Sequence, residues 1–574
     1  MNSVITINIA GAAGQGMQTI GFLLAKIFIR SGLHVFAVQD NESRIRGGHN
    51  FISLRVSQKP VMAMTKSFDL LVALNQNAFN THQNRLSDTT VVIFDTAMVP
   101  SGPFRGCLCD VPLQQIALES GGDEIYSNAV ALGAIVAIVR GSRDVMEATL
   151  NDYFSQKEKV AAANCSAARA GHDHVLKIHS NLSLPLSPSS SDKTRKMFIS
   201  GHEAIALGAL AAGCQFYAAY PMSPATSILS YLAGKAHDFS LVVEQPEDEI
   251  AAINMAIGAS CVGLRSMTAT SGGGFSLMVE TLGLSGIAEI PLVLVESQRP
   301  GPATGLATRT EQADLRFVIH AAQGEFPRVV LAPGTAREAF YLTIKAFQIA
   351  DEYQMPVIIL TDQYLADSCF TEERFKFDHM MNKRFFSEAL LPESTEAFLR
   401  YRFTDTGISP RYPITGDHKE MMYDSHEHTE SGHITEDAGI RTGMVKKRFK
   451  KMEGVFSKIA SPMVEGAQDA SLLLVGWGST YGVLHEITAA LNSEGIPVRL
   501  MHIQELWPFP VKSAIAELSQ AKKWVVVENN YTSQLSGLIR EKTCLQPSGT
   551  ILKYDGRPFY FDELRDEVMK EVKR

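Results

Sequence analysis

The 574-residue sequence has few cysteines, no long apolar run and no excess of positive charge. Its seven cysteines are odd in number and scattered, which favours reduced thiols over a disulfide framework. Only Cys107 and Cys109 lie close together, and two ligands cannot hold an iron–sulfur cluster alone. We therefore expect this pair to be buried strand residues, and any such cluster to sit on another chain.

The missing apolar run excludes a membrane-spanning helix, because a span needs about 20 apolar residues. A formal net charge of −8 argues against a nucleic-acid-binding face. The first residues, MNSVITINIA, lead into a glycine turn without the cationic and long apolar regions of an export signal. We expect a cytoplasmic protein with no membrane or nucleic-acid partner.

Short apolar strands alternate with helical stretches along the chain, which predicts three α/β domains. The first domain, 1–180, is expected to hold a mainly parallel sheet. A polar stretch rich in Ser and Pro predicts a linker at 181–195. A second domain is predicted at 196–380, an extended arm at 381–465 where the apolar alternation fades, and a third domain at 466–574.

A glycine turn, GAAGQG, joins the first strand to the first helix and contains Gly11, Gln15 and Gly16. Backbone N–H groups and the helix N-terminus could receive an anion there, such as a pyrophosphate. The spacing GxxGxG differs from the dinucleotide fingerprint GxGxxG, which weakens a nicotinamide interpretation. Glycine in such a turn also serves chain geometry alone, so both interpretations stay open.

The segment SRIRGGH carries Arg44, Arg46 and His49 around a Gly-Gly turn. These side chains suit contact with a phosphate or a carboxylate. The alternative is that they are solvated loop charges. A different segment, SHEHTESGHITED at 425–437, contains three histidines among acids, but their spacing matches no ordinary zinc module. We expect no metal site in this chain.

Two motifs in the second domain present polar groups on rigid backbone. AAYPMSPATS at 218–227 places Ser223 between two prolines, whose fixed φ angles hold the loop. EDEIAAINMAIGAS then begins a helix with acids, which are ordinarily favourable with the helix dipole. The dipole accounts for Glu247 and Asp248 without any further role.

Two glycine-containing loops are the remaining candidate motifs of the second domain. TATSGGGFSLMVE at 268–280 predicts a strand, a tight turn and a helix start, a shape that admits a ligand or simply tight packing. ESQRPGPATGLATRTEQADL at 296–315 follows the strand PLVLVES, at the carboxyl end where α/β sites usually lie. The guanidinium of Arg299 in this loop could bind a carboxylate through two hydrogen bonds. The alternative interpretation is that Arg299 is an ordinary surface arginine.

Taken in order, these segments resemble 2-oxoacid:ferredoxin oxidoreductases over nearly the whole chain. GAAGQGMQTIGFLLA, SRIRGGHNFISLRVS and NAVALGAI are similar to the γ subunit or domain. YPMSP, TSGGG and RPGPATGLAT resemble the YPITP, TSGPG and RGPSTGxPT motifs of the α subunit, and the histidine-containing arm resembles EHxExGHxTED. The last domain resembles the transketolase C-terminal domain.

The resemblance implies thiamine diphosphate as the cofactor and assigns roles around it. Glu249 is implied to hydrogen-bond N1′ of the cofactor's aminopyrimidine, and Ser223 to lie beside the thiazolium and the substrate. Arg299 and Thr308 are implied to contact the 1-carboxylate and the 2-oxo group. The remaining implied cofactor contacts are Pro221, Met222, Thr270, Ser271 and Gly272.

The γ-type domain is linked in this family to coenzyme A, a co-substrate. Gly11, Gln15, Gly16, Arg44, Arg46 and His49 are therefore candidate contacts of substrate or coenzyme A. A GDG segment followed by Asn, which holds diphosphate and Mg²⁺ in thiamine enzymes, is missing. The resemblance places Mg²⁺ and a [4Fe-4S] cluster on a β subunit, within an (αβ)2 heterotetramer that reduces ferredoxin.

The implied activity is reversible oxidative decarboxylation of a 2-oxoacid to an acyl-coenzyme A and CO2. Ser223 stands where Thr is commoner, and a fused γ–α chain with Ser looks more like the 2-oxoglutarate branch, whose product is succinyl-CoA. Alternatives are pyruvate or a branched-chain 2-oxoacid as substrate, a nicotinamide-dependent oxidoreductase using GAAGQG, or a non-catalytic scaffold subunit.

Overall fold

The structure is a computed structural model that describes residues 4–41, 47–100, 105–186, 196–386, 398–414 and 421–574. Arg44, Arg46 and residues 187–195 of the predicted linker lie outside this set. The chain divides into two compact units. Unit 1 comprises Met1–Ile199, Asp367–Arg374 and Phe559–Lys570, and unit 2 comprises Ser200–Ala366, Phe375–Pro558 and Glu571–Arg574. Within the described residues, every helix is too short or too polar to cross a membrane.

The described part of unit 1 contains a mixed sheet with the strand order β6-β5-β4-β1-β3-β2-β14-β7. Its strands are β1 (Val4–Ala13), β2 (His34–Asn41), β3 (Gly47–Ser57), β4 (Leu70–Ala73), β5 (Val91–Phe94), β6 (Cys107–Asp110), β7 (Met197–Ser200) and β14 (Ser368–Glu372). The pair Cys107 and Cys109 lies on β6, with Cys109 buried.

The expectation of a mainly parallel first sheet is wrong. β4, β5 and β6 run parallel to β1, but β3 is antiparallel to both β1 and β2, and β14 is antiparallel to β2. Only residues 42–46 connect β2 to β3, which is far shorter than the dozen or so residues that a parallel crossover needs. The connection length therefore dictates an antiparallel pair.

Strand β14 lies in the range predicted for the second domain, yet it pairs with the first sheet. Thr371 bonds through its hydroxyl to both the N–H and the carbonyl of Val35, each at 2.8 Å. The rings of Phe36 and Phe370 pack at 5.0 Å between centroids. The first folded unit thus takes in a segment far along the chain, which differs from the predicted boundary at 180.

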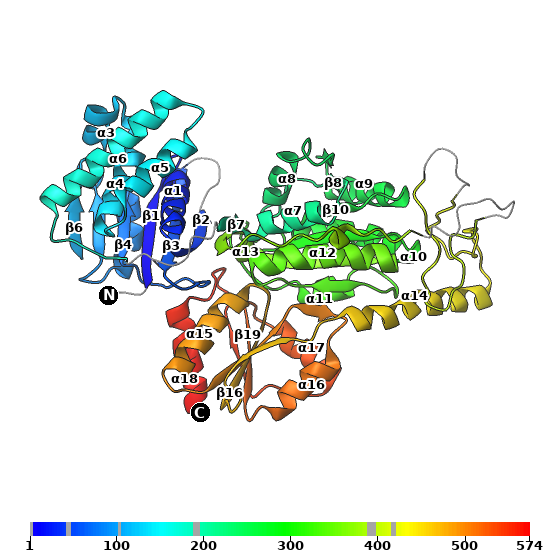
Figure 1. Ribbon diagram of the computed structural model, residues 1–574. Helices are drawn as coiled ribbons and strands as arrows, with labels where there is room; N and C mark the ends of the chain where they lie inside the picture. Colours follow the sequence, from blue (N-terminus) through cyan, green and yellow to red (C-terminus); the bar gives the residue numbers. More distant parts are fainter. Residues whose placement is uncertain (1–3, 42–46, 101–104, 187–195, 387–397, 415–420) are drawn as a thin grey trace. The chain divides into compact units, whose positions relative to one another are not determined.

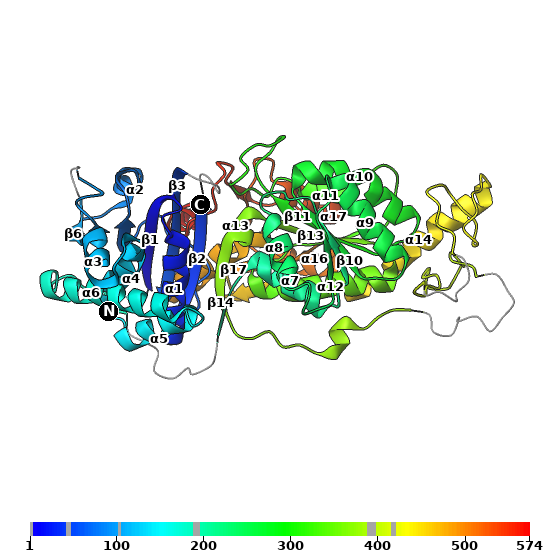
Figure 2. The ribbon, with the colours of Figure 1, turned by 90° about the horizontal axis from the view of Figure 1, so that it is seen from above.

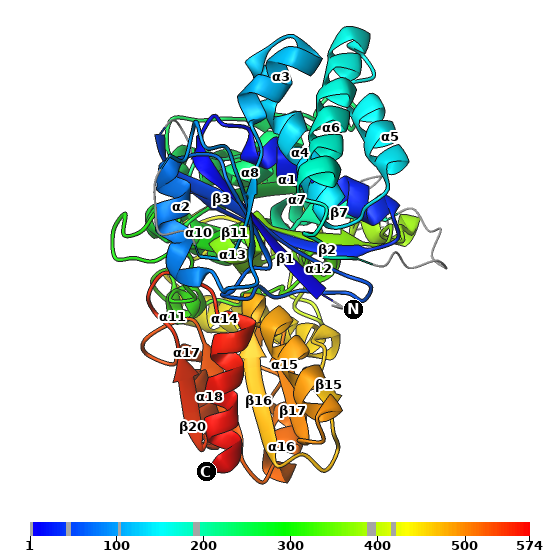
Figure 3. The same cartoon turned by 90° about the vertical axis from the view of Figure 1, so that its left-hand side faces the viewer.

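Alternating residues of the unit 1 strands face two different layers. Ile5, Ile7 and Ile9 pack in the core formed with α1, α4 and α6, whereas Ala10 and Leu71 pack on the opposite face with α2. Figure 3 shows α4 and α6 together on one side of the sheet. The helices of this unit are α1 (Met17–Arg30), α2 (Gln76–His82), α3 (Leu113–Gly121), α4 (Ser127–Ile138), α5 (Arg143–Tyr153) and α6 (Glu158–Ile178).

The described part of unit 2 contains two further sheets. The first has the order β18-β12-β13-β11-β10-β8-β9 and is parallel except for β18. Its strands are β8 (Phe216–Ala218), β9 (Val242–Glu244), β10 (Ser266–Thr270), β11 (Leu292–Gln298), β12 (Val329–Leu331), β13 (Pro356–Asp362) and β18 (Glu505–Trp507). Its helices are α7 (Gly201–Ala211), α8 (Thr226–Ala233), α9 (Glu249–Cys261), α10 (Gly272–Ile287), α11 (Leu315–His320), α12 (Ala336–Tyr353) and α13 (Gln363–Asp367).

The last sheet has the order β15-β17-β16-β19-β20. Its strands are β15 (Met463–Gly466), β16 (Leu472–Trp477), β17 (Val498–Ile503), β19 (Trp524–Glu528) and β20 (Gly549–Leu552), and its helices are α15 (Tyr481–Ser493), α16 (Val511–Gln520) and α17 (Gln534–Thr543). Most of the last helix, α18 (Phe561–Lys573), belongs to unit 1. Leu294 and Phe275 share one apolar core with Trp477 and Ile503. The predicted second and third domains are therefore joined by a common core.

The segment predicted as an extended arm ends in a long helix, α14 (Ala438–Lys458), drawn in yellow in Figure 1. Asp437 caps its N-terminus, since its carboxylate accepts a 2.8 Å hydrogen bond from Ile440 N–H. Lys447 and Lys451 are buried and pair with Glu289, so part of the charge of this helix does not face solvent. Within the predicted arm of 381–465, this stretch is therefore helical.

Candidate active site

Three of the predicted motifs meet at one edge of the parallel sheet in unit 2. β8, β10 and β11 are parallel neighbours, so their carboxyl ends lie side by side. Figure 2 shows the nearby helices α9 and α10 next to one another. Ser223 is in the loop after β8, Ser271 directly follows β10, and Arg299 directly follows β11. The parallel arrangement is what brings these three sequence segments together.

Glu249 is the first residue of α9 and is buried, although acids at helix starts are usually exposed. Asp248 before it performs the ordinary capping role by accepting a 2.7 Å bond from Ala251 N–H. One carboxylate oxygen of Glu249, Oε1, is buried without a hydrogen-bond partner. A buried polar atom in this state indicates a missing partner.

Gly274 allows Glu249 and Thr270 to approach each other closely. A Cβ at position 274 would lie 2.0 Å from Thr270 Oγ1 and 2.6 Å from Glu249 Oε1, so no other residue fits without movement. Thr270 is fully buried at the end of β10. The predicted residues Glu249 and Thr270 are thus brought together around this glycine.

The start of α10 offers backbone donors beside this pair. The helix begins at Gly272, and Ser271 before it makes no capping bond with its side chain. The Ser271 hydroxyl is fully buried and has no hydrogen-bond partner. The first N–H groups of a helix have no partner within the helix, and they attract acceptors and anions.

Arg299 contacts the loop that carries Ser223. Its Nη1 donates a 2.8 Å hydrogen bond to the Ser223 carbonyl, and partial burial lowers the pKa of its guanidinium. Pro221 and Met222 are half-buried immediately before Ser223, and Thr308 is half-buried in the loop after Arg299. The bond fixes two predicted substrate contacts at a short distance from one another.

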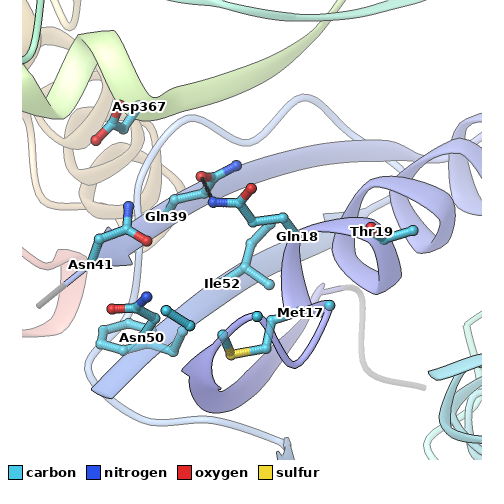
Figure 4. Close-up of a pocket in the computed structure, with 12 residues that line it drawn as sticks. Met17, Gln18, Thr19, Gln39, Asn41, Asn50, Ile52 and Asp367 are labelled. Carbon is cyan, nitrogen blue, oxygen red and sulfur yellow. Dashed lines mark hydrogen bonds between the residues drawn. The ribbon is translucent and has the colours of Figure 1, made fainter. Parts of the chain in front are cut away.

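Unit 1 contains a separate cavity of about 450 Å³ at the N-terminus of α1 (Figure 4). Four amide side chains line it: Gln18, Gln39, Asn41 and Asn50. Gln18 donates a 3.1 Å hydrogen bond to Gln39 Oε1. Gly14 and Gly16 also line the cavity, with φ of 95° and 73°, which favour glycine.

Of the predicted γ-domain contacts, Gly16 faces this cavity and the other two residues of the turn shape it. Gln15 Oε1 accepts hydrogen bonds from Ala12 N–H at 2.6 Å and from Asn75 Nδ2 at 2.7 Å. A Cβ at Gly11 would lie 2.6 Å from that same oxygen. Packing within the turn therefore requires a glycine at position 11, whether or not the turn also binds a ligand.

His49 does not line the cavity. Its Nε2 lies 2.9 Å from Nε2 of His82, whose pKa burial lowers to about 3. Among the residues that the structure describes, no group of three or more His, Cys, Asp or Glu could hold a metal ion.

Comparison with known proteins identifies the family. Residues 207–447 match the thiamine-diphosphate-binding domain of pyruvate flavodoxin/ferredoxin oxidoreductases, 6–174 match pyruvate ferredoxin/flavodoxin oxidoreductase, and 470–564 match its core domain II. The 2-oxoacid:ferredoxin oxidoreductase subunit alpha of Sulfolobus sp is 32% identical, over 98% of this chain and 96% of its own length. The chain belongs to the 2-oxoacid:ferredoxin oxidoreductase family.

Two further relatives extend this finding. The 2-oxoglutarate oxidoreductase subunit KorA of Mycobacterium tuberculosis is 27% identical, over 98% of this chain and 90% of its own. The solved 2-oxoglutarate:ferredoxin oxidoreductase from Magnetococcus marinus, with 2-oxoglutarate, coenzyme A and succinyl-CoA bound, superposes with a TM-score of 0.92 and 31% identity over the full length of both chains. The chain is thus an α subunit with an N-terminal γ-like region.

This α subunit also has two acids beside the site, within the segment 296–315, that were not among the predicted contacts. Glu296 on β11 stands in register with Thr270, is fully buried, and neither of its carboxylate oxygens has a hydrogen-bond partner. Burial, together with Asp314 and Asp362, raises its pKa well above the usual value. The available sequence signal was an acid closing an apolar strand, as in PLVLVES and PVIILTD.

Asp314 supports the start of α10. A Cβ at Gly272 would lie 2.6 Å from Asp314 Oδ2, and the Asp314 N–H donates a 2.9 Å bond to Gln298 Oε1. Burial raises the pKa of Asp314 to about 6, from an ordinary value of 3.8. Because the folded state holds this proton more tightly than the unfolded state, stability falls as the pH rises through this window.

We expect Asp314→Asn to stabilise the chain above pH 6, by about 3 kcal/mol for a shift of this size. The gain should shrink as the pH falls and disappear by about pH 3, where the carboxyl is protonated in both the folded and unfolded states. Unfolding temperatures measured from pH 3 to 7 test this, with the exposed acid variant Asp238→Asn as control. A gain that is constant across this range would contradict the prediction.

Proposed function

We propose that this chain is the α subunit of a coenzyme-A-acylating 2-oxoglutarate:ferredoxin oxidoreductase. The reaction converts 2-oxoglutarate and coenzyme A to succinyl-CoA and CO2, with two electrons passed to ferredoxin, and it is reversible. The observation that carries the proposal is the buried, partnerless Glu249 oxygen within a chain that matches a solved 2-oxoglutarate enzyme end to end.

The residues of unit 2 fit thiamine diphosphate. Thiamine diphosphate supplies an electron sink that lets the bond between the carboxylate and the 2-oxo carbon break. Glu249 would hold the pyrimidine through its partnerless oxygen, and a carboxyl group can carry the proton of such a bond. Ser271 and Gly272 at the start of α10 would border the same ring, with Pro221 and Met222 on the other loop.

Arg299, Ser223 and Thr308 would bind the 2-oxoacid. A guanidinium is planar and suits a carboxylate, and its bond to the Ser223 carbonyl orients it before the substrate arrives. In this proposal Arg299 receives the 1-carboxylate, and the hydroxyls of Ser223 and Thr308 lie near the 2-oxo oxygen. Burial around Arg299 strengthens such a contact by excluding water.

A β subunit would complete the site. The chain lacks a GDG segment and a cysteine set, so Mg²⁺, the diphosphate contacts and the [4Fe-4S] cluster are assigned to that partner, in an (αβ)2 assembly. The surface of α9 and α10 next to Glu249 supports this division, because Ile250, Met255 and Leu277 are about half exposed there. A partner subunit that packed on α9 and α10 would cover these apolar side chains.

The unit 1 cavity is the proposed site for part of coenzyme A or of the substrate. Its amide lining and the α1 N-terminus offer neutral donors. In the sequence, Arg44 and Arg46 come three and five residues after the cavity residue Asn41, and in this proposal they add cationic contacts.

Reconstitution tests the proposal. The isolated chain should be colourless and inactive, whereas the co-purified complex should reduce ferredoxin or methyl viologen only with a 2-oxoacid and coenzyme A. A bound iron–sulfur cluster in the isolated chain, detected by visible absorption and iron analysis, would contradict the division of labour. Reduction of NAD by the isolated chain would favour the nicotinamide interpretation instead.

The substrate prediction concerns the second carboxylate of 2-oxoglutarate. We expect a higher kcat/KM for 2-oxoglutarate than for pyruvate or 2-oxobutyrate, because Ser223 leaves more space than Thr. Arg46→Ala should raise KM for 2-oxoglutarate by roughly ten- to a hundredfold, the range for one charged hydrogen bond, while sparing the smaller acids. A higher kcat/KM for pyruvate in the intact complex would overturn the substrate assignment.

A further inference from the structure

A buried histidine connects the two loops of the proposed substrate site. His202 is the second residue of α7 and is fully buried. Its Nδ1 lies 2.8 Å from Ser227 Oγ in the first turn of α8. Its Nε2 lies 3.2 Å from Ser297 Oγ on β11, a residue that is also fully buried. The ring therefore bridges two elements that are 70 residues apart in the sequence.

The hydrogen bonds around His202 can be given one consistent direction. The Ser227 hydroxyl donates its proton to the Pro224 carbonyl at 3.2 Å, so Ser227 must accept from His202 Nδ1–H. In a neutral imidazole, Nε2 is then an acceptor and takes the proton of the Ser297 hydroxyl. This series of hydrogen bonds runs from Ser297 through His202 and Ser227 to the Pro224 carbonyl.

This series of hydrogen bonds lies next to the bond between Arg299 and Ser223. Pro224 directly follows Ser223, and Ser297 precedes Arg299 by two residues on the same strand end. The loop after β8 is therefore tied to β11 twice, once by Arg299 Nη1 on the Ser223 carbonyl and once by His202. Two attachments restrain the loop in rotation as well as in distance.

We propose that His202 is a positioning residue for 2-oxoacid binding, because its ring fixes the spacing between Ser223 and Arg299. The inference rests on the proposed function and deepens it. His202 lies behind the site on α7, and it acts through the loop rather than on the substrate. Loss of the restraint weakens carboxylate binding alike in the ground state and in the transition state, which raises KM and leaves kcat nearly unchanged.

The test uses the complex of this chain with its β partner. His202→Phe keeps a ring and removes both hydrogen bonds, and we expect it to raise KM for the 2-oxoacid by about three- to tenfold, with kcat little changed. The KM for coenzyme A should stay the same, since a general loosening of the fold would alter both values. His202→Gln should restore part of the affinity, because an amide can donate and accept.

Ser297→Ala is a second and smaller change that guards against misfolding, and it should raise KM in the same direction. Its matched control is Ser285→Ala, a fully buried serine whose hydroxyl donates a single 2.7 Å bond to the Ile290 carbonyl. An unchanged KM in both His202→Phe and Ser297→Ala, or a fall in kcat alone, would overturn the role of His202. If the wild-type complex turned over no 2-oxoacid, the proposed function itself would fail and the substrate role of His202 with it.

Discussion

Replacing Glu249 with glutamine should leave the complex assembled and reduce kcat by about 10²–10⁴-fold. The exchange keeps the size of the side chain, so the close packing against Thr270 and Gly274 is preserved. What it removes is a carboxyl group whose Oε1 is buried without a partner and is proposed to exchange a proton with the cofactor. An amide cannot serve as a proton acceptor in that role.

Steady-state viologen reduction with saturating 2-oxoacid and coenzyme A measures this effect, and size-exclusion chromatography checks assembly. Glu247→Gln is the matched control, because Glu247 is an exposed acid two residues earlier that needs no role beyond the helix dipole. Turnover at the wild-type rate in an assembled Glu249→Gln complex would remove this residue from the mechanism.

Glu289→Gln should lower the free energy of unfolding by about 3–5 kcal/mol, the cost of leaving buried charges without their partner. Glu289 is fully buried, and it pairs with Lys447 Nζ at 2.6 Å and Lys451 Nζ at 2.5 Å from α14. Arg400 adds a 2.7 Å bond to the Glu289 carbonyl. An amide would leave two ammonium groups buried with little compensation.

The loss of unfolding free energy in Glu289→Gln, relative to the wild type, should become smaller as the pH rises. Burial already lowers the pKa of Lys451 to about 8, although Glu289 opposes this shift. Without Glu289, the lysines lose their protons in the folded state at a lower pH than in the unfolded state, so stability rises with pH through that window.

Denaturant unfolding of Glu289→Gln at pH 6 and pH 9 measures this difference. The surface pair Lys570–Glu567 provides the control, since Glu567→Gln should cost less than about 1 kcal/mol. Adding Lys447→Met and Lys451→Met to Glu289→Leu should recover most of the lost stability, because a well-packed apolar set replaces the ions. A loss of under 1 kcal/mol at pH 6 would show that the cluster does not anchor α14.

Local sequence patterns were sufficient to predict the fold class and many of the helices and loops of this protein. Short apolar strands between helical stretches predicted the α/β class, and the turn and helix-start signals predicted α1, α7, α9 and α10 near their observed positions. The loops that carry Ser223, Thr270 and Arg299 were expected at strand ends, and they occur there because parallel strands align their carboxyl ends. These features depend on residues close together in the chain.

Strand partners and buried charges were decided by the tertiary structure. β14 pairs with β2, which lies more than 300 residues earlier in the sequence, and periodicity within a segment carries no information about such a partner. In the same way, Lys447 and Lys451 are paired with Glu289, which is 158 residues before Lys447 in the sequence, and no local pattern indicates that partner.

The same division applies within the site. The sequence by itself determined which residue types stand at each strand end and hence the family that the chain belongs to. Only the tertiary structure decided that Glu249 is buried beside Gly274, that Asp314 lies against Gly272, and that His202 joins the two loops. Burial and contact depend on the packing of segments that are distant in sequence, and the physical chemistry of a side chain follows from those surroundings.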